Sequence, residues 1–143
     1  MKKAQDALMK LYGSVVVFTL FFAFSAACPA AARMKESVYQ VAWCASHGGL
    51  TEVVLEDRTR VDCVTSVHAV EVDFAPKWAE AIGQALYYAM RTGRTPGILL
   101  IMESERDARF LERLMAVTGS LGIEVWTITP EDVSGNDGEP RRR

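Results

Sequence analysis

Residues 60–88 read RVDCVTSVHAVEVDFAPKWAEAIGQALYY, the pattern of two short strands followed by a helix. Asp62 and Glu71 lie symmetrically about the Ser66-Val67 pair. An antiparallel hairpin closed there, by two or four residues, would place the two carboxylates opposite each other. Cross-strand β-carbons lie roughly 4.5–5.5 Å apart, and like charges at that separation destabilise the pair unless a cation or a proton intervenes. The pattern therefore predicts a metal site on this hairpin.

Asp73 adds a third carboxylate to the hairpin. Strand alternation puts it on the same face as Glu71, while Val70 and Val72 point to the opposite face. Carboxylate oxygens are the ligands that Mg²⁺ and Mn²⁺ prefer. The expected cofactor is therefore Mg²⁺ or Mn²⁺, held by Asp62, Glu71 and Asp73. Glu52 shares the hairpin region and is a candidate for a further ligand, but alternation does not settle its face.

The rest of the chain predicts alternating helices and strands. Helical spacing with a Gly-Gly stop favours a first helix, and Pro76 suits the first turn of the helix after the hairpin. Helices are expected at residues 36–47, 76–91 and 104–119, and strands at residues 50–55, 61–65, 68–74, 98–102 and 123–129. Residues 98–102 are continuously apolar, which is typical of a strand buried on both faces and paired in parallel. These elements give an α/β domain with a mixed sheet, in the order α-β-β-β-α-β-α-β.

This order resembles the PD-(D/E)xK nuclease superfamily, whose fold is restriction-endonuclease-like. The likeness covers residues 36–129, with an Asp on the second strand, Glu-x-acid on the third and a helix that carries Gln and Tyr. In those enzymes the Asp and the Glu of an E-x-K element hold one or two divalent ions, the Lys helps to position or activate the attacking water, and the Gln supports the site. The resemblance implies the Asp role for Asp62, the Glu role for Glu71 and the helix Gln role for Gln84.

One position departs from that superfamily. The lysine of E-x-K is replaced by aspartate in Glu71-Val72-Asp73. Lys77 is a candidate for the missing cation, because it stands seven residues before Gln84, so that both side chains project on the same side of the helix. The resemblance implies a nuclease acting on DNA or RNA, with catalytic roles for Asp62, Glu71, Lys77 and Gln84. A degenerate, noncatalytic exported domain that keeps the nuclease fold for binding is the alternative.

Residues 1–32 have the features of a secretory signal. Lys2, Lys3 and Lys10 precede an apolar run over residues 15–27, and small residues follow at 30–32. Cleavage after residue 32 would leave an exported protein, periplasmic or secreted, with no stable membrane span. Lipidation at Cys28, retention of the segment as an anchor, or a true start at Met34 are the alternatives.

Charge and cysteine content describe the remaining domain. Removing the leader's three lysines and one aspartate changes the formal net charge from −2 to about −4, which counts against strong nonspecific attraction to a polyanion.

Cys44 and Cys63 are the cysteines left after cleavage, and an even pair in an exported protein favours a disulfide, with two buried free thiols as the alternative. Residues 130–143 are polar and rich in glycine, and predict a disordered tail.

Overall fold

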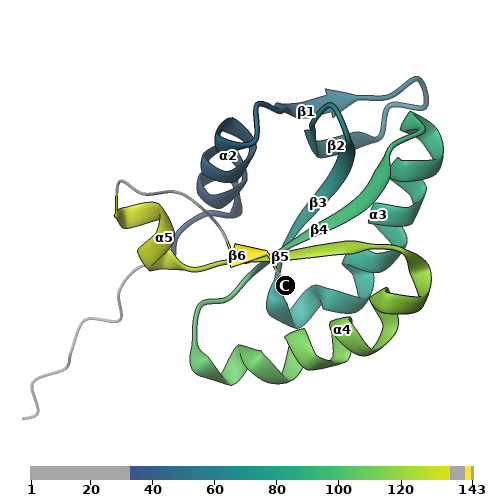
Figure 1. Cartoon of the computed structure of the whole chain (residues 1–143). Coiled ribbons are helices and arrows are strands. Elements are labelled where there is room, and N and C mark those ends of the chain that lie inside the picture. The colour runs from purple at the N-terminus through teal and green to yellow at the C-terminus, as the bar shows by residue number, and fades with distance from the viewer. Residues whose placement is uncertain (1–32, 136–140, 143) are drawn as a thin grey trace, which may run out of the picture. The chain divides into compact units, whose positions relative to one another are not determined.

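The computed structural model describes residues 33–135 and the backbone of residues 141–142 (Figure 1). The elements are α2 (Glu36–Ser46), β1 (Leu50–Val54), β2 (Arg60–Val64), β3 (His68–Phe74), η1 (Ala75–Lys77), α3 (Trp78–Thr92), β4 (Thr95–Ile101), η2 (Glu105–Asp107), α4 (Ala108–Leu121), β5 (Glu124–Ile128), α5 (Pro130–Ser134) and β6 (Arg141–Arg142). Up to β5 this is the predicted order of helices and strands, so the mixed α/β fold class is confirmed. The leader predicted at residues 1–32 lies outside the described residues.

In the described part of the chain, one mixed sheet has the strand order β1-β2-β3-β4-β5-β6. β1, β2 and β3 form an antiparallel meander, β3, β4 and β5 run parallel, and the short β6 is antiparallel to β5. Each parallel pair needs a crossover connection, and α3 and α4 provide the two crossovers.

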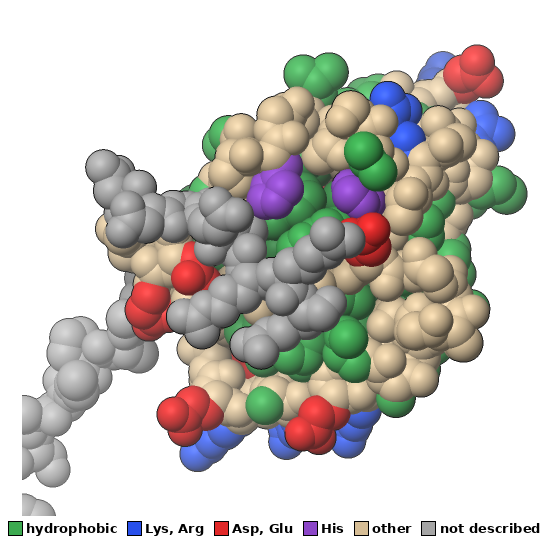
Figure 2. Space-filling view, in the orientation of Figure 1, with side chains coloured by type: hydrophobic (Ala, Val, Ile, Leu, Met, Phe, Trp, Pro, Cys, Tyr) green, Lys and Arg blue, Asp and Glu red, His purple; other side chains and the backbone are tan. Residues whose placement is uncertain are grey.

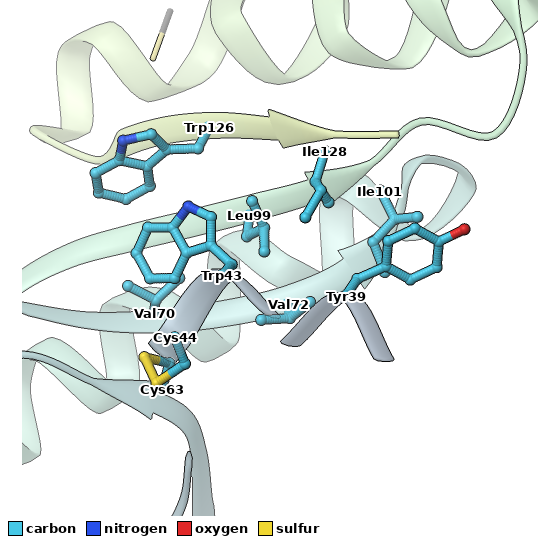
Figure 3. Close-up of a cluster of buried hydrophobic side chains, with 10 residues drawn as sticks. All are labelled: Tyr39, Trp43, Cys44, Cys63, Val70, Val72, Leu99, Ile101, Trp126 and Ile128. Atoms are coloured by element: carbon cyan, nitrogen blue, oxygen red, sulfur yellow. A yellow bond between two sulfur atoms is a disulfide. The ribbon is translucent and has the colours of Figure 1, made fainter. Parts of the chain in front are cut away.

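The two faces of the sheet are covered by different helices (Figure 1). On one face, α2 packs Tyr39, Trp43 and Cys44 against alternate residues of the strands (Figure 3). The indole rings of Trp43 and Trp126 contact each other there in a tilted arrangement. On the other face, α3 and α4 cover Ile98 and Leu100 of β4. Both faces of β4 are therefore buried, as its continuous apolar run predicts.

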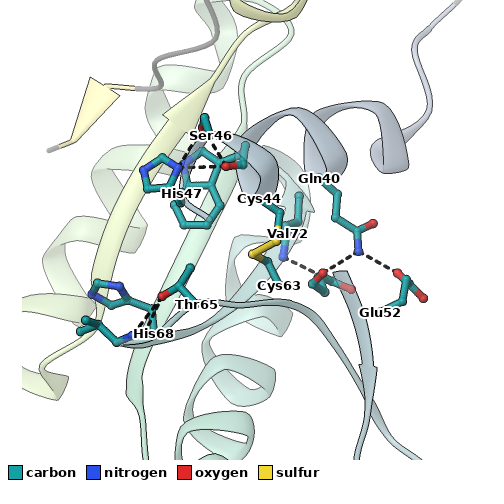
Figure 4. Close-up of a disulfide and its surroundings, with 12 residues drawn as sticks. Gln40, Cys44, Ser46, His47, Glu52, Cys63, Thr65, His68 and Val72 are labelled. Atoms are coloured by element: carbon teal, nitrogen blue, oxygen red, sulfur yellow. Dashed lines mark hydrogen bonds between the residues drawn. A yellow bond between two sulfur atoms is a disulfide. The ribbon is translucent and has the colours of Figure 1, made fainter. Parts of the chain in front are cut away.

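The disulfide between Cys44 and Cys63 is formed, with the α-carbons 5.7 Å apart. It joins α2 to β2, and both cysteines are fully buried (Figure 4). Gly49 lies so close to the disulfide that a β-carbon at this position would be 2.6 Å from the Cys63 sulfur and 2.7 Å from the Cys44 sulfur. The predicted bridge is thus confirmed, and it fixes α2 beside the strand that carries Asp62.

The C-terminal segment differs from the sequence prediction. Residues 130–134 form α5 instead of a disordered tail. Thr129 caps this helix: its hydroxyl accepts from the Asp132 amide at 3.4 Å, and the Asp132 carboxylate accepts from the Thr129 amide at 2.8 Å. Pro130 at the first helical position adds to the helix start. None of the described helices is both long enough and apolar enough to cross a bilayer.

Candidate functional site

The β2–β3 hairpin has the predicted register. Cys63 pairs with Val70 and Val64 with Ala69, and the Thr65 amide donates to the His68 carbonyl at 2.9 Å. The same register, continued by one residue, sets Asp62 beside Glu71. The carboxylate of Asp62 also accepts a hydrogen bond from the Val72 amide at 2.7 Å, which holds it against β3.

The predicted residues line one pocket of about 390 Å³, here called the acid pocket. Its wall comes from α2, the three antiparallel strands, η1 and α3. The lining residues are Glu36, Glu52, Thr59, Arg60, Asp62, Glu71, Val72, Asp73, Lys77, Gln84 and Tyr88. The three predicted metal ligands and the two predicted supporting residues, Lys77 and Gln84, are all among them.

Glu71 is the central buried acid of this pocket. Glu71 is only 5 % exposed, and its Oε2 atom has no hydrogen-bond partner among the described residues. Burial, and then the neighbouring charge of Asp62, raise the pKa of Glu71 to about 9. An ionised carboxylate in such a place is costly unless a proton or a cation neutralises it. At neutral pH a proton shared in the hydrogen bond between Glu71 and Asp62 supplies this neutralisation, and a cation bound between the two carboxylates would replace that proton.

Asp62 and Asp73 share this environment. Burial raises the pKa of each above its ordinary value, and the Val72 amide acts in the opposite direction on Asp62. In the described part of the chain, no three His, Cys, Asp or Glu residues are grouped so that they could hold a metal ion as they stand. The donor chemistry, the carboxylates of Asp62 and Asp73 beside Glu71 with its orphaned oxygen, suits a hard divalent cation, and binding one requires these three side chains to move closer together.

Lys77 reaches the acid pocket from η1. Its ammonium group lies 3.3 Å from Oδ1 of Asp73, and its side chain is 55 % exposed. The hydrogen bond to Asp73 raises the pKa of Lys77, so the group stays charged. Lys77 thus places a positive charge beside Asp73 in the wall of the acid pocket.

Gln84 faces the same pocket from α3, two turns after Lys77. The Tyr88 hydroxyl donates a long hydrogen bond of 3.4 Å to the Gln84 amide oxygen. Because the oxygen of this amide accepts from Tyr88, the amide nitrogen of Gln84 is the atom that can donate to a ligand. Burial raises the pKa of Tyr88 to about 12, so its hydroxyl keeps its proton.

Sequence reasoning missed Glu36, Arg60 and Tyr88, and left open the face on which Glu52 lies. Two of these had a signal: Arg60 precedes Asp62 by two residues on one strand, and Tyr88 follows Gln84 by one helical turn. Glu36 had none, because its place depends on how α2 docks on the sheet.

Both histidines lie outside the acid pocket. Figure 2 shows them near each other on one face, with apolar surface between them. His47 stacks on Trp43 with ring centroids 3.9 Å apart, and His68 meets the ring of Trp126 edge-on at 5.1 Å. These contacts assign the histidines to aromatic packing.

A larger hollow of about 530 Å³ lies where β4 and β5 end. Two of the acids that line it have partners: Glu103 pairs with Arg33 at 2.6 Å, and Asp132 caps α5. The acid pocket remains the better candidate site, because it contains the buried acid with an orphaned oxygen.

Comparison of the chain with protein-family models, curated proteins and solved structures gave no match. The assignment to a nuclease superfamily therefore stays a proposal.

The raised pKa of Glu71 makes metal-free stability depend on pH. Between about pH 4.5 and pH 9 the folded state holds a proton that the unfolded state has lost, so the free energy of unfolding falls as pH rises. One such proton corresponds to at most about 1.4 kcal/mol per pH unit. Urea unfolding in a chelator at several pH values measures this slope, and Glu71→Gln should flatten it. An equal slope in the variant would contradict the assignment.

Proposed function

We propose that this protein is a divalent-metal-dependent hydrolase of nucleic-acid phosphodiesters, and a divergent, restriction-endonuclease-like member of the PD-(D/E)xK superfamily with E-x-D in place of E-x-K. The observation that carries the proposal is the buried, unpartnered Oε2 of Glu71 in a pocket wall shared with Asp62 and Asp73. A buried carboxyl oxygen without a hydrogen-bond partner costs free energy unless a water molecule or a ligand satisfies it.

Asp62, Glu71 and Asp73 would hold Mg²⁺ or Mn²⁺. When bound, such an ion polarises phosphoryl oxygens and lowers the pKa of water. Lys77 carries a positive charge beside Asp73, where it can stabilise negative charge on a phosphate. Gln84 presents an amide donor that is oriented by Tyr88.

A noncatalytic binding domain is the second candidate. It is favoured by Asp73 itself, because an acid stands where the superfamily places lysine and makes the pocket more negative. The two functions differ in one result: both can bind a cation, but only the hydrolase cleaves.

Export to an oxidising compartment belongs to the same proposal. The support is the fully buried Cys44–Cys63 disulfide, since such bonds persist mainly outside the reducing cytosol. The signal-like pattern of residues 1–32 points the same way.

The test is cleavage of single-stranded and duplex DNA and RNA by the purified domain, with Mg²⁺ or Mn²⁺ and with a chelator. We expect cleavage with metal, none with chelator, and none from Asp62→Asn. Saturable metal binding without cleavage of any substrate would favour the noncatalytic function, and absence of both would refute the metal site.

A further arm of this test is Lys77→Ala. The rate should fall, while metal affinity stays the same or rises, because a nearby positive charge opposes cation binding. Arg106→Ala, an exposed cation on η2, is the matched control. A rate equal to that of the control would remove Lys77 from the site.

A further inference from the structure

We propose that Arg60 binds a phosphate group of the substrate at the mouth of the acid pocket, and that Glu52 and Gln40 are positioning residues that hold its guanidinium group there. The inference rests on the proposed function and extends it to the residue that recognises the anionic substrate. It is carried by three connected side chains, each from a different element: β2, β1 and α2.

The acid pocket has an excess of negative charge. Its wall includes five carboxylate residues and two cationic residues, Arg60 and Lys77, in the described part of the chain. One bound divalent cation would not cancel five negative charges, so a phosphate needs direct contact with a cation to approach. Lys77, 3.3 Å from Asp73, has the role proposed above. Arg60 is the second cation of the pocket wall.

Arg60 precedes Asp62 by two residues on β2, so strand alternation sends both side chains to the same face. Its side chain is 64 % exposed, and its Nη1 atom lies 2.8 Å from Oε2 of Glu52. A guanidinium group has five N–H donors in a planar fork, so this one contact leaves donors for a phosphate.

Glu52 has a φ of 56° that lies in the left-handed region, which is unfavourable for a residue with a side chain. The buried Gln40 fixes it: the Nε2 atom of Gln40 donates to Oε1 of Glu52 at 2.7 Å and to the carbonyl of Asp62 at 2.8 Å (Figure 4). One amide thus ties the partner of Arg60 to the strand that carries Asp62.

A purely structural role explains this arrangement less well. An exposed ion pair such as Glu52–Arg60 contributes little to the free energy of folding. The left-handed backbone conformation of Glu52 costs more free energy than such a pair contributes. Strained residues of this kind are concentrated at functional sites. The unfavourable backbone conformation of Glu52 is explained if the carboxylate of Glu52 orients Arg60 toward a ligand.

The experiment is steady-state cleavage of fluorescein-labelled oligonucleotides, DNA and RNA. It compares six proteins: wild type, Arg60→Ala, Arg60→Lys, Glu52→Gln, the Arg60→Ala/Glu52→Gln double variant and the control Arg91→Ala. Arg91 is also an exposed arginine paired with a glutamate, Glu56 at 3.6 Å, but it lies outside the acid pocket. Arg60→Ala should raise KM at least about tenfold, the usual size of a lost charge-assisted hydrogen bond. Its Mn²⁺ affinity by calorimetry should stay equal or increase.

Glu52→Gln tests the positioning role. Glutamine can still accept from Gln40 through its amide oxygen, but its amide nitrogen no longer attracts Arg60. KM should rise less than in Arg60→Ala, and the double variant should be no worse than Arg60→Ala alone. Arg60→Lys, which keeps the charge without the fork, should recover part of the loss.

Two results would overturn the inference. If the wild type cleaves but Arg60→Ala has the KM of Arg91→Ala, Arg60 does not bind the phosphate and the proposed function stands. If the wild type cleaves no oligonucleotide with Mg²⁺ or Mn²⁺, the proposed function fails and this inference fails with it.

Discussion

Glu71→Gln is expected to lower metal-dependent cleavage by more than about 100-fold. Glutamine keeps the shape of the side chain but removes the charge that a hard cation needs. Changes to residues that only support metal ligands already cost about 10–100-fold, so loss of a ligand should cost more. Initial rates at saturating Mn²⁺ measure the effect.

Unfolding would not explain that loss, because Glu71→Gln should stabilise the metal-free protein at neutral pH. The substitution removes an acid whose burial raises its pKa to about 9. Glu112→Gln, an exposed change on α4, is the matched control and should leave both activity and stability unchanged. Full activity in Glu71→Gln, or a variant that is inactive because it is unfolded, would contradict the role given to Glu71.

Loss of the Cys44–Cys63 disulfide is expected to lower the free energy of unfolding by about 3 kcal/mol. The bridge spans 19 positions of the sequence, and closing a loop of this size restricts the unfolded chain by about that amount. For a domain of roughly 100 residues, Tm should then fall by more than about 10 °C. Thermal unfolding of the Cys44→Ala/Cys63→Ala double variant measures the change.

The same variant tests the link between the disulfide and the site. Gln40 lies one helical turn before Cys44, and Asp62 is the chain neighbour of Cys63, so loosening α2 should also weaken Mn²⁺ binding. A reductant should reproduce both effects in the wild type and change nothing in the variant. An unchanged Tm in the variant would show that the bridge does not stabilise the domain.

Local patterns in the sequence predicted the parts of the site that depend on periodicity. The hairpin register followed from the symmetric placement of Asp62 and Glu71 about the Ser66-Val67 pair, and the shared side of Lys77 and Gln84 followed from their spacing of seven. Period-two and helical alternation are local properties, so one sequence was enough to place these residues.

The remainder of the pocket depends on tertiary structure. Glu36 and Gln40 reach the site because α2 docks on the sheet, and no local pattern encodes that contact. Glu52 could not be assigned to a face because its left-handed backbone interrupts the alternation of β1. The polar, glycine-rich composition of residues 130–143 indicates a tail, but the local capping box of Thr129 and Asp132 is sufficient to start a helix at Pro130.

The central claim is that the acid pocket binds a divalent cation. The most direct measurement is anomalous diffraction from crystals of the protein soaked in Mn²⁺. The account predicts a manganese peak within bonding distance of the carboxylates of Glu71 and Asp62, and its loss in Glu71→Gln. A peak only elsewhere on the protein, or none in the acid pocket at saturating Mn²⁺, would contradict it.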